Sequence, residues 1–234
     1  MKKILAWLLV LCMLAANSAA ALAEAPALHK NRVKELYSAE GTYTDDMGNV
    51  ENYSFHVPQI DADTPNAGKI NREIAKTFGQ LVEYQFENMR DGLSLWSWEC
   101  GWHAYWYGSQ LFLLVSSEEE GGFTNYEAYG YDFENDRRVT NTMILSELGI
   151  SEQTYMDNLR EKVQLMFESM YGHLPERDKE MFGYDKMLEK TMSWLDMEQP
   201  MFIDGMGKIV TIVKIASIAG ADWYYHLATP FAYG

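Results

Sequence analysis

LSLWSWECGWHAYWYGSQLFLLVSSEEEGGFTNYEAYGYDF, residues 93–133, is the stretch that decides the fold of this chain. It holds three runs rich in aromatic and other apolar residues, near 94–107, 111–117 and 124–133. The breaks between them, at 108–110 and 118–122, consist mainly of glycine and polar residues. Runs of this length bounded by turn formers predict strands, and short connections join antiparallel neighbours. We therefore predict an antiparallel meander at the centre of a sheet.

A hairpin is predicted on the N-terminal side of this meander. Residues 41–44 and 52–57 flank a cluster of turn formers at 45–49. The second arm alternates apolar and polar side chains, as expected for a strand with one buried face. Pro58 is expected to end the strand pairing, and His56 is expected to face solvent.

Helices are predicted on both sides of the meander. Before it, Thr64 is placed to cap a helix with Pro65 in its first turn. Its apolar face recurs at spacings of three and four, at Ile70, Ile74, Phe78 and Leu81. After it, Ser151 is placed to cap a long helix that ends at Gly172. The apolar face of this second helix comprises Tyr155, Leu159, Val163, Met166, Phe167 and Met170.

The last third of the chain closes with a second hairpin, in which residues 201–203 oppose 208–217 across a glycine-rich turn. Together these elements predict an α+β fold, with an antiparallel β-sheet of hairpin, meander and C-terminal hairpin packed against two or three helices. No repeat or low-complexity linker divides the sequence. We expect the hairpin and helix of residues 24–90 and the remainder, 91–234, to form one integrated domain.

The first 23 residues have the pattern of a secretory signal peptide. Lys2 and Lys3 precede an apolar run from Ile4 to Ala16, and small residues end the segment at Ala23. The apolar run is shorter than the roughly 20 residues of a membrane-spanning helix. We therefore expect cleavage after Ala23, a secreted, extracytoplasmic protein, and no membrane span after cleavage.

Charge is the strongest signal in the composition. The chain has 34 acidic and 19 basic residues, a formal net charge of −15, and loss of Lys2 and Lys3 would make it −17. Such a polyanion repels nucleic acid and attracts a basic protein, a cationic peptide or a divalent cation. The alternative is that the charge serves solubility alone.

Aromatic residues crowd the first strand of the meander, and three glutamates follow the second strand. The candidate binding residues are Trp96, Trp98, Trp102, Tyr105, Trp106, Glu118, Glu119 and Glu120. Aromatics on both faces of a strand suggest that one face packs inward while the other is open to stack on the sugar rings of a glycan such as peptidoglycan. The alternative is that other elements cover both faces.

No catalytic or metal-binding motif emerges. Once Cys12 leaves with the signal peptide, Cys100 is a lone cysteine, and His103, three residues further along a strand, points to the opposite face. An EF-hand loop begun at Asp132 would need glycine at 137 and glutamate at 143, where the chain has Arg137 and Met143. We therefore expect a solvated turn there, no metal, no cofactor and no enzyme activity.

The alternative is a cell-wall hydrolase or deacetylase whose carboxylates come from Glu99, Glu118 and Glu127.

Four stretches of the sequence resemble a family of bacterial extracytoplasmic domains. They are residues 64–71, which open the first helix; 111–117 with Gly121-Gly122; 131–133 leading to 144–148; and 207–210 in the last hairpin. The family is that of the RsiV anti-sigma factor ectodomain, the DUF3298/DUF4163 type, also found in PdaC-like peptidoglycan deacetylases. The turn after residue 133 departs from the family's usual Thr-Gly pair, since it reads Glu134-Asn135-Asp136-Arg137.

The resemblance implies an α+β fold and a role in binding. Because the sequence shows neither a membrane helix after the signal peptide nor a deacetylase domain, we expect a free-standing secreted binding module. The family's lysozyme-sensing member suggests one ligand class, a basic cell-wall hydrolase, and the aromatic strand suggests a second class, cell-wall glycan.

Overall fold

The computed structural model describes residues 32–119, 121–218 and 222–231 of the chain. The predicted signal peptide and Glu120 therefore lie outside the described residues. The described strands are β1 (Val33–Thr44), β2 (Val50–Ile60), β3 (Ser97–Tyr107), β4 (Gln110–Glu119), β5 (Phe123–Asp132), β6 (Arg137–Arg138), β7 (Met201–Ile203), β8 (Ile209–Ala216) and β9 (Trp223–Ala228). The helices are α2 (Pro65–Ile74), α3 (Gln80–Arg90), α4 (Asn141–Glu147), α5 (Glu152–Tyr171), α6 (Glu176–Phe182) and α7 (Tyr184–Ser193), and the π-helical turn η1 (Ala75–Gly79) joins α2 to α3.

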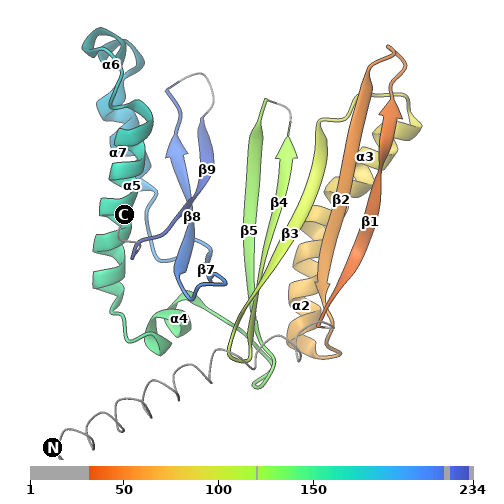
Figure 1. Ribbon diagram of the computed structural model, residues 1–234, viewed down its shortest axis with the longest axis horizontal. Helices are drawn as coiled ribbons and strands as arrows, with labels where there is room; N and C mark the ends of the chain where they lie inside the picture. Colours follow the sequence, from red (N-terminus) through yellow and green to blue (C-terminus); the bar gives the residue numbers. More distant parts are fainter. Residues whose placement is uncertain (1–31, 120, 219–221, 232–234) are drawn as a thin grey trace, which may run out of the picture.

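The strands form two sheets, and the predicted α+β class is confirmed. The larger sheet has the order β1-β2-β3-β4-β5-β6, and the smaller has the order β7-β8-β9 (Figure 1). Helices α2 and α3 lie against the larger sheet, while α5 and α7 lie on the far side of the smaller one. The two sheets thus lie between two helical layers.

The meander predicted from residues 93–133 is confirmed as β3, β4 and β5, each antiparallel to its neighbour. The prediction of a wholly antiparallel sheet is wrong at one junction, because β2 and β3 are parallel over Ser54↔Glu99 and Phe55↔Cys100. Parallel neighbours need a long crossover connection, and the α2-η1-α3 segment supplies it. The C-terminal hairpin is also confirmed, but it belongs to the separate smaller sheet.

The central strand β4 is buried on both faces and joins the two halves of the core. Its residues Leu111, Leu113 and Val115 pack in the cluster that contains the apolar side chains of α2. Phe112 and Leu114 point the other way, into the cluster that contains the smaller sheet and α5. Burial on both faces accounts for the continuous apolar run of this strand.

The N-terminal hairpin is confirmed but is longer than predicted. Pro58 does not end the pairing, because it lies opposite Glu35 and the ladder continues to Ile60. The register shifts between Glu35 and Tyr37, so an irregularity accommodates the residue that lacks an N–H donor. His56 is not simply solvated either, since its ring nitrogens lie 2.9 Å from Glu35 and 2.8 Å from Glu40.

Both predicted helix starts are confirmed by their capping hydrogen bonds. The Thr64 hydroxyl accepts from the backbone N–H of Ala67 at 3.3 Å, and the Ser151 hydroxyl accepts from that of Thr154 at 3.1 Å. No helix in the described part of the chain is long and apolar enough to span a membrane.

The turn after β5 is solvated at Glu134, Asn135 and Arg137, as the sequence predicts, but the aspartate that precedes it is buried. Asp132 is 1% exposed, and its carboxylate accepts hydrogen bonds from Ser109, Asn135 and Arg137. Burial alone would raise the pKa of this carboxyl, but these donors outweigh it and lower the pKa. Asp132 therefore holds the turn together as a buried, hydrogen-bonded anion.

Candidate functional site

The predicted aromatic residues do not form one surface. Trp102 and Trp106 pack on the side of the larger sheet that faces α2, while Tyr105 stacks on Phe202 of the smaller sheet with ring centroids 5.3 Å apart. Trp96 contacts a tyrosine of α3, and Trp98 lines a separate cavity of about 490 Å³ beside the first hairpin. The alternation of side chains along β3 separates these residues onto two faces.

The predicted glutamates are separated as well. Glu118 lies opposite Thr124 near the end of the β4–β5 hairpin, and Glu119 accepts a hydrogen bond from Asn125. Glu99 is exposed on β3, directly across from Glu118. Burial raises the pKa of Glu119, and the bond from Asn125 partly offsets this.

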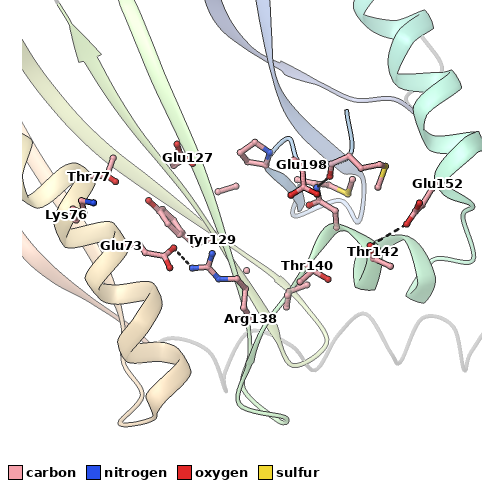
Figure 2. A pocket seen from close by; sticks show the side chains of 17 residues that line it. Glu73, Lys76, Thr77, Glu127, Tyr129, Arg138, Thr140, Thr142, Glu152 and Glu198 are labelled. Carbon is pink, nitrogen blue, oxygen red and sulfur yellow. Dashed lines mark hydrogen bonds and ion pairs between the residues drawn. The ribbon is translucent and has the colours of Figure 1, made fainter. Parts of the chain in front are cut away.

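A cavity of about 910 Å³ opens between the two halves of the molecule, where charged side chains converge from several elements (Figure 2). Its helix side is formed by Glu73, Lys76 and Thr77. The floor includes β5 from Glu127 to Gly130 together with Arg138 of β6. Its far side consists of Thr140, Asn141, Thr142, Glu152, Met197, Glu198, Pro200 and Met201.

Two smaller cavities extend this one along β5. The first, of about 260 Å³, shares Thr77 and Glu127 with the large cavity. The second, of about 250 Å³, shares Glu119, Asn125 and Tyr225 with the first. We call the three together the β5 groove, because residues of β5 line all of them.

Negative charge dominates the β5 groove. Its ionisable lining comprises the carboxylates of Glu73, Glu119, Glu127, Glu152, Glu198 and Asp222 against the cations of Lys76 and Arg138. Arg138 is already paired with Glu73. Glu152 and Glu198 are exposed, and Glu152 accepts only a long hydrogen bond, 3.5 Å, from Thr142. The groove therefore presents more carboxylates than its own cations neutralise.

Glu127 is the half-buried carboxylate of this groove. Burial raises its pKa most; Lys214 opposes the increase, and the nearby Glu73 adds to it. Beside it, burial also raises the pKa of Tyr129, whose hydroxyl shares a hydrogen bond with Thr77. Glu127 thus lies where a positive charge from a ligand would relieve an unfavourable environment.

We expect Glu127→Gln to stabilise the fold at neutral pH. The folded-state pKa is raised above its usual 4.5, so the folded protein holds this proton more tightly than the unfolded chain. The anion therefore destabilises the fold increasingly as pH rises above about 4.5 and up to the folded pKa. Urea unfolding at pH 4 and pH 7 measures this, and the variant should differ from wild type only at pH 7. A variant less stable than wild type at pH 7 would contradict the assignment.

Aromatic side chains line one end of the groove, and the sequence did not predict a site there. Phe123 stacks on Tyr224 with centroids 5.0 Å apart. The Lys214 ammonium lies 4.7 Å from the ring centre of Trp223 and 5.4 Å from that of Tyr225. The signal was present as the run Trp223-Tyr224-Tyr225, but no strand was predicted there.

Other candidate chemistry finds no support in the described residues. Cys100 is fully buried, and burial raises the pKa of its thiol to about 12. A thiol with that pKa is not a nucleophile at neutral pH. Across residues 32–119, 121–218 and 222–231, no three His, Cys, Asp or Glu side chains are grouped to hold a metal ion.

Comparisons with known proteins find similarity among solved structures. No protein-family model matches the chain, and no curated protein does either. Among solved structures, the chain is similar to a member of the DUF3298 family from Bacteroides fragilis, with 11% sequence identity and a TM-score of 0.39. The alignment covers 84% of this chain and 88% of the other. The neighbour belongs to the family type that the four sequence stretches resemble.

Proposed function

We propose that this chain is a secreted, non-enzymatic binding module of the cell envelope, and that its β5 groove holds a basic protein. The observation that carries the proposal is the charge of the groove, whose lining has six carboxylates against two cations; Lys214 and Lys190, outside the lining, act on Glu127 and Asp222. Two of the carboxylates in the large cavity, Glu152 and Glu198, are exposed and have no cation paired with them among the described ion pairs.

A groove of this kind favours cations for two physical reasons. Walls of low dielectric concentrate the field of the carboxylates and speed the arrival of a positive partner. A bound ammonium or guanidinium group also stabilises the ionised form of Glu127, whose charged state is otherwise penalised by burial. Both effects depend on charge, so binding should weaken as salt rises.

Capture experiments at low and high salt test this function. The purified protein is mixed with hen lysozyme as a basic probe and, separately, with insoluble peptidoglycan. We expect lysozyme to be retained at low ionic strength and released at high salt, because the Debye length falls from about 10 Å at 0.1 M to about 3 Å at 1 M. Salt-resistant retention on peptidoglycan would instead assign the groove to glycan. Capture of neither would contradict the proposed function.

The raised pKa of Glu127 favours one second candidate, a cell-wall hydrolase in which this carboxyl acts as general acid. Incubation with purified peptidoglycan tests it. A hydrolase would release soluble fragments with time, and Glu127→Gln would abolish the release. Absence of fragments between pH 4 and pH 8 would reject this candidate and leave the binding function in place.

A further inference from the structure

One edge of the larger sheet is unpaired where it borders the groove. On its inner side β5 pairs with β4 along its whole length. On its outer side it pairs with only the two residues of β6, through Tyr131 and Asp132. Within the described sheets no strand is hydrogen-bonded to the outer edge of β5 from Phe123 to Ala128; β9 lies close to β5, with Phe123 stacked on Tyr224, but does not pair with it.

Two backbone hydrogen bonds near the end of β5 show which of its backbone groups face that edge. The Phe133 N–H donates to the Ser109 carbonyl at 3.1 Å, so the odd-numbered residues of β5 are bonded to β4. Conversely, the Gly130 carbonyl accepts from the Val139 N–H at 3.0 Å on the outer side. By this alternation the N–H and C=O groups of Thr124, Tyr126 and Ala128 point outward.

All three of these residues line the β5 groove. Ala128 lies in the large cavity, Tyr126 in the first smaller cavity and Thr124 in the second. Natural proteins usually protect such an edge with proline, lysine or an inward charge, because a row of free donors and acceptors recruits another strand. Residues 123–128, FTNYEA, contain neither proline nor lysine, and their single charged residue is the half-buried Glu127, which a cationic strand would neutralise. The outward main-chain groups therefore add directional hydrogen bonding to the acidic groove.

We propose that the β5 groove takes an extended, cationic segment of its partner protein as an added strand along β5. The added strand would bond to the outward groups of Thr124, Tyr126 and Ala128, as in other cases of β-strand addition. Alternate side chains of a strand point to opposite faces. Figure 2 shows carboxylates on both sides of the groove, with Glu73 on the helix side and Glu152 and Glu198 on the far side. A lysine or arginine that faces the far side of the groove thus meets Glu152 or Glu198, whereas Glu73 on the helix side is already paired with Arg138.

This inference rests on the proposed function, because it specifies how a basic partner is bound at the same groove. It differs from simple charge attraction in one respect. Charge attraction requires only lysine or arginine side chains, whereas strand addition also requires the backbone N–H groups on one side of the peptide. Peptides with the same charge but blocked backbone donors separate the two mechanisms.

The probe is the peptide acetyl-KVKVKVK-amide, tested against two N-methylated versions, one modified at its lysines and the other at its valines. In the version whose blocked N–H groups face β5, binding should fall at least about tenfold, the equivalent of about 1.4 kcal/mol. The other version should bind like the parent peptide. Equal binding of both versions would overturn strand addition while leaving the basic-partner function intact.

Amide hydrogen exchange of the protein, followed by NMR, provides an independent readout. In the free protein the amides of Tyr126 and Ala128 should exchange faster than those of Asn125 and Glu127, which bond to β4. The parent peptide should slow exchange at Tyr126 and Ala128 at least about tenfold, since the slowing reflects the occupied fraction of the edge. Peptide binding without this protection would overturn the inference, and so would capture of lysozyme without any binding of the peptide.

Discussion

Reversing two exposed charges of the groove, Glu152→Lys with Glu198→Lys, is expected to weaken capture of lysozyme at least about tenfold at low salt, a loss of about 1.4 kcal/mol or more. Each substitution replaces an attraction with a repulsion for a cationic ligand. Both side chains are exposed, so the fold should tolerate the change. Titration of the variant with lysozyme at 50 mM and 500 mM salt measures the effect, and the difference from wild type should be largest at 50 mM.

A matched variant separates the groove from the overall charge of the molecule. Glu161→Lys with Glu189→Lys makes the same change in net charge on the exposed surfaces of α5 and α7. We expect this control to bind lysozyme within about twofold of wild type, because charges more than a Debye length from the ligand are screened. Equal losses in the two double variants would show that capture depends on net charge alone and that the groove has no special part in it.

Truncation of the side chain that joins the two sheets, Phe112→Ala, should cost about 3–5 kcal/mol of folding free energy. Phe112 is completely buried on β4 and lies in the cluster that unites the smaller sheet with α5. Its removal leaves a cavity in the strand that contributes fully buried apolar side chains from its two faces to the two core clusters. Urea unfolding measures the loss.

The control for this truncation is Phe182→Ala, at a phenylalanine that is 42% exposed on α6. The same atoms are deleted there, but solvent already reaches the ring and can fill the space that it leaves, so the cost should stay at about 0.5 kcal/mol or less. Similar losses at the two positions would contradict the assignment of Phe112 to a core that holds the sheets together.

The local elements of this fold were predictable because their signals are local. Thr64 and Ser151 cap helices through hydrogen bonds to residues three positions ahead, so each capping motif lies within one helical turn of the sequence. The meander was predictable for the same reason, since its strands follow one another with short turns. The alternation of the hairpin likewise placed Phe55 and Val57 in the core correctly.

The parts that sequence did not predict are those that depend on distant pairing. The parallel contact of Phe55 with Cys100 joins residues separated by an entire helical segment. Buried Asp132 reads in sequence as one more polar turn residue, because its burial and its bond from Ser109, 23 residues away in the β3–β4 turn, depend on the assembled sheet. Strand β9 was missed, and its aromatic run was therefore not assigned to any site.

The residues of the candidate site divide in the same way, into those that local sequence indicates and those that only the folded chain brings together. Glu119 and Glu127 were recognised in sequence as carboxylates near the aromatic strand, and both line the β5 groove. Their partners in the groove, Glu152 and Glu198, come from segments more than twenty residues further along the chain. Chain topology brings these groups together, and no spacing within the sequence encodes their convergence.

Cross-linking of lysozyme to the protein with a zero-length carbodiimide reagent, mapped by mass spectrometry, tests the central claim most directly. The reagent joins a lysine amine to a carboxylate only where the two are in contact. We predict cross-links concentrated at Glu127, Glu152 and Glu198 of the β5 groove. Cross-links distributed instead over the outer carboxylates of α5 and α7, such as Glu161 and Glu189, would contradict the account, because the protein would then attract basic partners by its net charge and not through the groove.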